Sequence, residues 1–298
     1  MYQNFKELSG SLPADAPKTL VVAAAHDLHT LEAVYAAMES LPMRYILVGD
    51  REKIVEISGA IGKTPDPGDI LDGGDDADCA RKAVGLIRSG RGNVLMKGLL
   101  DTGTLLKAAL DKESGIRGTG TMSHLAMLEV PGYSKLIGVT DGGMLPHPTL
   151  EQKADITRNV VMFFQKLGIA QPKVAALTAS ESVSEKMPET KDAAELQAMC
   201  ERNELGGCVL EGPLSFDIAV CKESAALKKH PSVISGEPDI FLVPSVATGN
   251  IMCKALLYWG GATMAGCVLG AKVPIVLVSR GATAEEKLLS IMLCLKAG

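Results

Sequence analysis

Short apolar runs alternate with amphipathic segments along the whole chain. Runs of four to seven aliphatic, often β-branched residues are typical of buried strands, whereas apolar positions three and four residues apart are typical of helices. The pattern predicts strands over residues 19–25, 44–50, 93–98, 173–180, 207–212, 238–245 and 275–278. It predicts helices between them, most clearly over residues 28–41, 51–60 and 102–112. Such alternation indicates a mainly parallel α/β fold.

The middle of the chain departs from this alternation. Residues 121–130 and 134–143 are predicted as adjacent strands joined by a turn at Pro131-Gly132, and residues 148–168 as a long amphipathic helix that ends at Gly168. A change of domain is therefore expected within residues 120–145. We predict one α/β domain from residues 1–125 and 268–298, and a second from residues 126–267.

The last predicted strand, Ile275–Val278, runs directly into Ser279-Arg280-Gly281. Thr283 and Glu286 have the spacing of a capping box, so a helix is predicted to start at Thr283. Ser279 and Arg280 then lie between the carboxyl end of a strand and a helix N-terminus. In open parallel sheets, ligands bind at this edge.

Two further segments, residues 210–217 and 243–250, also join a strand end to glycine and polar residues. A glycine near a helix N-terminus lets backbone N–H groups approach an anion. Every α/β protein has several such turns, however, and Thr248-Gly249-Asn250 taken alone is better explained as a helix N-cap than as a ligand site.

Composition excludes several classes of protein. Of the 298 residues, 47% are hydrophobic and 22% are charged, which is enough for a large core. The net charge of −5 argues against a nucleic-acid surface. Lys6 and Glu7 stand where a signal peptide would be apolar, and Lys272 and Pro274 interrupt the longest apolar stretch, so we expect a cytoplasmic protein and no membrane. Seven cysteines without a C-x-x-C pair favour reduced thiols over disulfides or zinc.

Taken together, the polar strand ends resemble one family. "GPLSFDIAV", "FLVPSVATGNIMCKAL" and "VLVSRGATAEEKLLSI", with "DGGMLPHPTLEQKADI" upstream, are similar to segments of the phosphate acetyltransferase and butyryltransferase family. The resemblance covers about the last two-thirds of the chain, and residues 1–90 share only the strand-helix rhythm. "LMKGLLDTGTLLKAAL" and "GTMSHLAMLEV" look more like the butyryl branch.

The resemblance implies a fold and a reaction. The fold would be a two-domain, mainly parallel α/β sandwich of the isocitrate/isopropylmalate dehydrogenase type. The reaction would convert butyryl-CoA and phosphate reversibly into butyryl phosphate and coenzyme A, in a ternary complex without a covalent acyl-enzyme. Coenzyme A would be a substrate, with acyl-CoA, phosphate and acyl phosphate as partners and no metal or resident cofactor. A homodimer or higher homo-oligomer is also implied.

Three alternatives stay open. The first is acetyl transfer in the same fold. The second is a metal-dependent decarboxylating dehydrogenase of related fold, which would need clustered aspartates where "FDIAV" offers only Asp217. The third is a non-catalytic acyl-CoA-sensing module, against which the retained Ser279, Arg280 and Glu286 argue.

The resemblance also assigns site residues. Ser279 and Arg280 match the family's catalytic pair, and Glu286 stands where the acetyl enzymes carry the aspartate proposed as base. Gly142 stands where acetyl enzymes often have cysteine. Lys97 or Lys107 is expected to supply a missing arginine's charge. The remaining expected substrate-binding residues are Ser123, His124, Asp141, Thr248, Gly249 and Asn250.

Physical chemistry supports these roles unequally. A guanidinium at Arg280 can hold two oxygens of a phosphate or acyl phosphate, and Ser279 can donate to a developing oxyanion or simply form the turn. A free thiol has a pKa of about 8.5 and a free glutamate one of about 4.3, so an ordinary glutamate is a weak base for a thiol. Glu286 is therefore either a base or a plain helix cap. His124 fits a core histidine as well as a site residue, and Asp141 fits two roles, lining the cleft or simply ending its strand.

Overall fold

The structure is a computed structural model that describes residues 2–10, 17–118, 120–279 and 281–297. The chain forms two compact units. The split unit comprises Lys6–Thr119 and Ala265–Gly298, and the central unit comprises Met1–Phe5 and Gly120–Met264. The units therefore change at residues 5/6, 119/120 and 264/265, whereas the sequence placed two boundaries, at 125/126 and 267/268. The first predicted boundary would have cut through a strand of the central unit.

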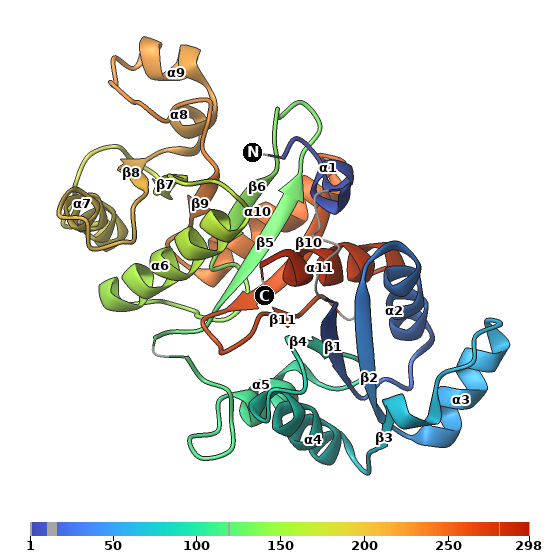
Figure 1. Ribbon diagram of the computed structural model, residues 1–298. Coiled ribbons are helices and arrows are strands. Elements are labelled where there is room, and N and C mark those ends of the chain that lie inside the picture. The colour runs from blue at the N-terminus through green and yellow to red at the C-terminus, as the bar shows by residue number, and fades with distance from the viewer. Residues whose placement is uncertain (1, 11–16, 119, 280, 298) are drawn as a thin grey trace. The chain divides into compact units, whose positions relative to one another are not determined.

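The split unit is built on a mainly parallel sheet (Figure 1). Its strands lie in the order β3-β2-β1-β4-β11-β10, and only the pair β10 and β11 is antiparallel. The strands are β1 (Lys18–Ala23), β2 (Met43–Gly49), β3 (Ile70–Asp72), β4 (Val94–Lys97), β10 (Thr263–Leu269) and β11 (Ile275–Val276). The first two residues of β10 belong to the central unit. In β1 and β4, residues 20–23 and 94–96 are fully buried because helices cover the sheet.

Four helices of this unit begin with an aspartate N-cap. Asp27, Asp50, Asp75 and Asp101 each accept a backbone N–H from the first turn of the helix that follows. A carboxylate there satisfies an unpaired donor and meets the positive end of the helix dipole. The helices are α1 (Phe5–Gly10), α2 (Leu28–Ser40), α3 (Arg51–Ala60), α4 (Asp76–Arg88), α5 (Thr102–Ala109) and α11 (Ala284–Ala297), with a 3₁₀ turn at Pro67–Asp69. Of α1, residues 6–10 belong to this unit.

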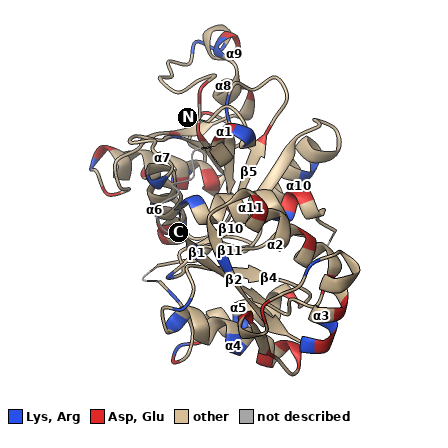
Figure 2. Ribbon diagram, turned by 45° about the vertical axis from the view of Figure 1, so that its right-hand side comes forward, with Lys and Arg blue, Asp and Glu red and all other residues tan. Residues whose placement is uncertain are grey.

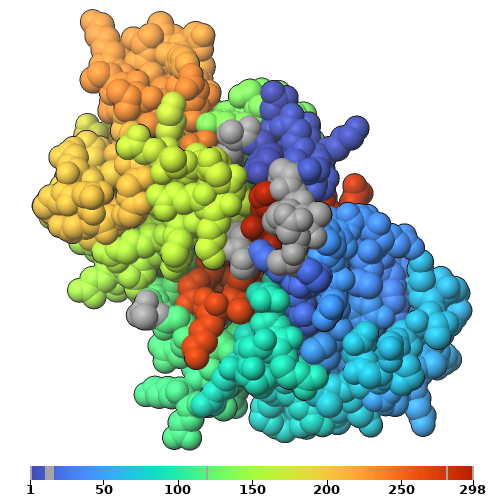
Figure 3. Space-filling model, in the orientation of Figure 1, coloured from blue at the N-terminus to red at the C-terminus, as the bar shows by residue number. Residues whose placement is uncertain are grey.

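The C-terminal segment completes this unit. Leu95 and Met96 of β4 pair in parallel with Ile275 and Val276 of β11, and Gly118 donates its backbone N–H to Gly270 at 3.1 Å. In the space-filling view, orange-red residues of the C-terminal segment accordingly lie against teal residues of the first segment (Figure 3). The predicted strand 275–278 is shorter than expected, because the chain leaves the sheet after Val276.

The strands of the central unit also run mainly parallel to one another. Its strand order is β5-β6-β9-β7-β8, with only β5 and β6 antiparallel. The strands are β5 (Ser123–Glu129), β6 (Ile137–Thr140), β7 (Lys173–Leu177), β8 (Val209–Leu214) and β9 (Ile240–Leu242). The helices are α6 (Leu150–Lys166), α7 (Pro188–Glu201), α8 (Phe216–Val220), α9 (Lys222–Leu227) and α10 (Val246–Tyr258).

Two local predictions for this unit are confirmed. Gly132, in the turn between β5 and β6, has φ +84°, and Gly168, just past α6, has φ +91°. Both values lie in the left-handed region that glycine adopts without a steric penalty.

Charged residues are spread over both units. In the view of Figure 2, lysines and arginines are interspersed with aspartates and glutamates. Within the described part of the chain, each helix falls short of the length and apolar character that a membrane span needs.

Candidate active site

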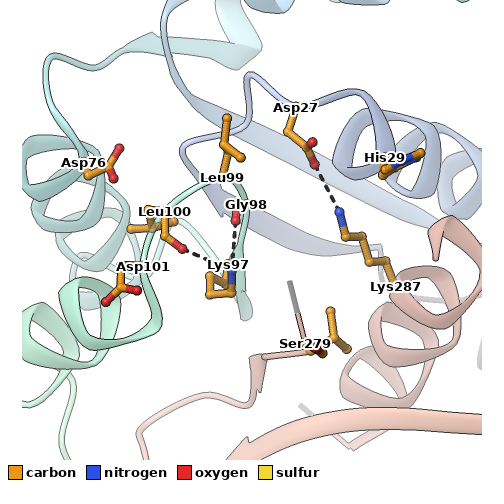
Figure 4. Close-up of a pocket in the computed structure, with 11 residues that line it drawn as sticks. Asp27, His29, Asp76, Lys97, Gly98, Leu99, Leu100, Asp101, Ser279 and Lys287 are labelled. Atoms are coloured by element: carbon orange, nitrogen blue, oxygen red, sulfur yellow. Dashed lines mark hydrogen bonds and ion pairs between the residues drawn. The ribbon is translucent and has the colours of Figure 1, made fainter. Parts of the chain in front are cut away.

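A cavity of about 330 Å³ opens in the split unit at the carboxyl ends of its parallel strands (Figure 4). The loops after β1, β4 and β11 supply most of its wall, and α11 supplies one side chain. The lining residues are Asp27, His29, Asp76, Lys97, Gly98, Leu99, Leu100, Asp101, Val278, Ser279 and Lys287. This is the edge of the sheet at which the sequence placed a ligand site.

Ser279 lies in the wall of this cavity and is exposed. Its backbone carbonyl accepts the N–H of Ala282 at 3.1 Å, so the chain turns here on its way into α11. Ser279 thus borders a space in which a substrate can bind. Arg280, the second residue of the expected catalytic pair, lies outside the described residues.

Glu286 forms the predicted capping box with Thr283. One carboxylate oxygen, Oε2, accepts the backbone N–H of Thr283 at 2.8 Å, and the backbone N–H of Glu286 donates to Thr283 Oγ1 at 3.2 Å. These bonds satisfy unpaired groups at the start of α11. Glu286 is half-buried and is not in the cavity wall, although Lys287 beside it is.

Of the two lysines predicted to carry substrate charge, the structure places only Lys97 at the cavity. Lys97 is 7% exposed, and its Nζ donates to the carbonyls of Gly98 at 3.2 Å and Leu100 at 3.1 Å. Lys107 is exposed on α5 and does not line the cavity. The geometry therefore favours Lys97.

Sequence reasoning missed Lys287. This residue is 9% exposed and donates to Asp27 Oδ2 at 3.1 Å and to Thr30 Oγ1 at 3.2 Å. Burial alone would raise the pKa of Asp27, but the hydrogen bonds from Thr30 and Lys287 lower it below its usual 3.8. Asp27 and His29 stand at the start of α2. Asp27 does cap α2, and both residues also line the cavity.

The other expected site residues lie in the central unit, around Asp141. Its carboxylate is 2% exposed and accepts four backbone N–H groups, from His124 at 3.1 Å, Gly143 at 3.0 Å, Met144 at 3.1 Å and Leu145 at 2.8 Å. A carboxylate so fully bonded fixes the turn after β6 and ties it to β5. Of the two roles left open by the sequence, lining the cleft or ending a strand, the geometry favours the second, because Asp141 directly follows β6 and holds the turn there.

Ser123 and His124 lie side by side at the start of β5. Ser123 is fully buried, and among the described residues its hydroxyl has no hydrogen-bond partner. His124 is half-buried and packs on the turn after β6, where a Cβ added at Gly143 would come within 2.9 Å of its ring. His124 is thus packed against the turn that Asp141 holds.

The loop at the start of α10 corrects one expectation. The N-cap of this helix is Ser245, which accepts the Thr248 N–H at 3.4 Å, so the cap lies three residues before the Thr248-Gly249-Asn250 segment. Thr248 and Asn250 are exposed, but Gly249 is buried. A Cβ at Gly249 would lie 2.7 Å from Gly142 Cα, so this glycine is required by packing.

The structure offers no ready metal site among residues 2–10, 17–118, 120–279 and 281–297. Within these ranges, no three His, Cys, Asp or Glu side chains are grouped as metal ligands would be.

Comparison with known proteins decides the family. The model of the family described as "Phosphate acetyl/butaryl transferase" matches residues 76–295. The chain belongs to this family. The sequence-based assignment to this family and to the acyltransferases is thereby confirmed.

Relatives from both branches of the family cover almost the whole chain. A phosphate butyryltransferase from Clostridium acetobutylicum is 39% identical over 98% of this chain and 97% of its own length. A phosphate acetyltransferase from Thermotoga maritima is 38% identical over 93% of this chain and 94% of its own. The similarity thus extends into residues 1–90, where the sequence alone showed only a rhythm of elements.

Solved structures confirm the predicted fold class. A branched-chain phosphotransacylase from Enterococcus faecalis is 31% identical, with a TM-score of 0.81 over 94% of this chain and 98% of its own. A 4-hydroxythreonine-4-phosphate dehydrogenase from Klebsiella pneumoniae shares the fold alone, at 13% identity and a TM-score of 0.56 over 95% of this chain. The family's fold is thus related to that of dehydrogenases, as expected.

Proposed function

We propose that this protein transfers an acyl group reversibly between coenzyme A and inorganic phosphate, and that butyryl is its preferred acyl group. The observation that carries the proposal is the exposed Ser279 in a cavity that two buried lysines also line. An acyl phosphate, free phosphate and a tetrahedral oxyanion are all anionic. Family membership supports the reaction class, and the butyryltransferase relatives, at 36–39% identity, support the butyryl group.

The chemistry needs few protein groups. A phosphate oxygen attacks the thioester carbonyl, a C–O bond forms, the C–S bond breaks, and the sulfur leaves as thiolate and takes a proton. The Ser279 hydroxyl donates to the carbonyl oxygen as its charge develops, and losing one such donor typically costs about 2.7–4 kcal/mol. Arg280 holds the phosphoryl oxygens, a role that rests on its place directly after Ser279 in the family's motif.

Glu286 is assigned the proton transfer in the reverse direction, in which the thiol of coenzyme A attacks the acyl phosphate. Oε2 is engaged in the capping box, and Oε1 has no hydrogen-bond partner among the described residues. One carboxylate can therefore cap the helix with one oxygen and accept a proton on the other. Coenzyme A is a substrate in this scheme, and no resident cofactor takes part.

The acyl preference is tested by following CoA-thioester formation with a series of acyl phosphates from acetyl to hexanoyl. We expect kcat/KM to peak at butyryl phosphate. A peak at acetyl phosphate would favour the alternative, acetyl transfer, since the acetyltransferase relative is almost equally similar.

Ser279→Ala should lower kcat about 10²–10³-fold with every acyl phosphate, and a variant with wild-type kcat would remove Ser279 from the mechanism.

Arg280→Ala should raise KM for phosphate and slow turnover without unfolding the protein. Arg280→Lys should recover only part of the activity, because a lysine lacks the planar fork of the guanidinium. Wild-type kinetics in the alanine variant would contradict the assignment.

The homo-oligomer and the cytoplasmic location expected from the sequence stay predictions, and light scattering tests the first.

A further inference from the structure

The cavity beside Ser279 contains a cation that neither the family motif nor the sequence pattern singled out. Two lysines line it, both at least nine-tenths buried. The ammonium of Lys97 lies against two backbone carbonyls. The ammonium of Lys287 is held by side chains instead, those of Asp27 and Thr30.

The position of Lys287 is fixed from both ends. Its backbone N–H donates to Thr283 O at 3.1 Å in the first turn of α11, and its side chain reaches the first turn of α2 (Figure 4). An ammonium has three N–H groups. Within the described part of the chain, the ammonium of Lys287 donates to two acceptors, Asp27 Oδ2 and Thr30 Oγ1, so one N–H remains for a bound molecule.

A purely structural role explains this arrangement poorly. Asp27 caps α2 without Lys287, since it accepts the Thr30 N–H at 2.9 Å. A buried ion pair is often no more stabilising than apolar side chains of the same volume. A lysine that only joined α11 to α2 would therefore contribute little more stability than an apolar residue of similar size. A lysine in the wall of a substrate cavity, by contrast, can pair with an anion.

We infer that Lys287 binds a phosphate group of the substrate, and that Asp27 and Thr30 hold its ammonium in position. The ligand chemistry is a phosphoryl group with free, negatively charged oxygens. Two sources have this chemistry: inorganic phosphate or acyl phosphate, and the phosphates of coenzyme A. The inference deepens the proposed function and rests on it for the identity of the substrates.

The test compares Lys287→Met with Lys82→Met. Lys82 is a matched control, because it is a helix lysine of the same unit that pairs with Asp78 at 2.8 Å and does not line the cavity. We expect Lys287→Met to raise KM at least tenfold for one substrate and to leave KM for the other within twofold. A rise for phosphate identifies the first source, and a rise for acyl-CoA identifies the second. Unchanged KM values for both substrates in a folded variant would overturn the inference.

Two further variants keep the test informative. If Lys287→Met does not fold, Lys287→Gln replaces it, since glutamine can still donate to Asp27 but has no charge, and the same outcomes apply. Asp27→Asn can still cap α2 but loses its charge, so it should raise the same KM by a smaller factor with kcat nearly unchanged. A fall in kcat alone would contradict the positioning role.

Direct binding separates this inference from the proposed function. Wild-type protein and Lys287→Met are each titrated with inorganic phosphate and, in a parallel experiment, with coenzyme A. The melting temperature is measured at each ligand concentration. A ligand that binds the folded state raises that temperature. At least one of the two should stabilise wild type and fail to stabilise the variant. This result would support the inference even if the wild type lacked acyltransferase activity, whereas equal stabilisation of both proteins would overturn it.

Discussion

Glu286 and Thr283 cap α11 by reciprocal hydrogen bonds: the carboxylate accepts the Thr283 N–H at 2.8 Å, and the Glu286 N–H donates to the threonine hydroxyl at 3.2 Å. Glutamine can fill the same position of a capping box but is not a base. Glu286→Gln should therefore keep the stability of the protein while lowering kcat about 10²–10⁴-fold, with little change in KM. Steady-state kinetics and thermal unfolding of the same preparation check this.

The control for that prediction is Glu286→Ala, which removes both the cap and the base. It should lose stability as well as kcat, since losing a helix cap costs about 0.5–2 kcal/mol. If Glu286→Gln retains kcat within a few-fold of wild type, Glu286 is a cap alone and the base must be another group.

Gly249 is predicted to be intolerant of any side chain. A Cβ at this position would lie 2.7 Å from Gly142 Cα and 2.9 Å from Val243 Cγ2. Gly249→Ala should thus lower the free energy of unfolding by about 1–3 kcal/mol. Gly59→Ala is the matched control: this helical glycine has open space around it and should gain about 0.4–1 kcal/mol. Chemical denaturation of the two variants compares them directly.

We predict that the Asp141 carboxylate contributes mainly to the stability of the protein. Its carboxylate accepts four backbone N–H groups, and alanine would leave buried donors without an acceptor. An unsatisfied buried donor typically costs about 1–3 kcal/mol, so Asp141→Ala should unfold at clearly lower denaturant concentration than wild type. Asp141→Asn keeps one acceptor oxygen and should be intermediate. An alanine variant as stable as wild type would show that the turn holds without the carboxylate.

The Asp27–Lys287 pair should make stability depend on acid pH. Hydrogen bonds from Thr30 and Lys287 outweigh burial and lower the pKa of Asp27 in the folded protein below 3.8. Because this pKa is lower in the folded than in the unfolded state, the pair stabilises the fold above about pH 4 and loses that contribution as the pH falls through the folded-state value. The difference in stability between wild type and Asp27→Asn should be constant above about pH 5 and shrink below pH 4. A difference that does not change with pH would contradict this.

Much of the fold could be predicted because the core strands are short apolar runs with clear ends. Residues 19–25 and 44–50, for example, became β1 and β2 with small changes at the ends. The strand β10, Thr263–Leu269, was missed because its apolar residues continue into Val273–Val278 and suggest one long stretch. The antiparallel pairing of β10 with β11 divides that stretch, and this depends on contacts that a local pattern does not contain.

Residues of the candidate site could be predicted only where they directly follow a recognisable strand end in the sequence. Ser279 was found because it follows a predicted strand, but Lys287 lies inside a predicted helix, where no local motif singles it out. Its partner Asp27 is 260 positions away. Only the packing of α11 beside α2 brings the two residues together. The sequence feature that could have pointed to this contact is a lysine in the first turn of the last helix, in a domain whose two segments are far apart in the chain.

The split unit also sets an order of events during synthesis. β4 is complete once residue 97 has been made, but its neighbour β11 begins only at residue 275. At translation rates of roughly 5–20 residues per second, the edge of β4 waits on the order of ten seconds or more for its partner. During that time Val94, Leu95 and Met96, all fully buried in the finished protein, border an open strand edge. The nascent chain thus passes through a stage in which it is vulnerable to aggregation and a suitable client for a chaperone, and the last 34 residues, 265–298, end that stage.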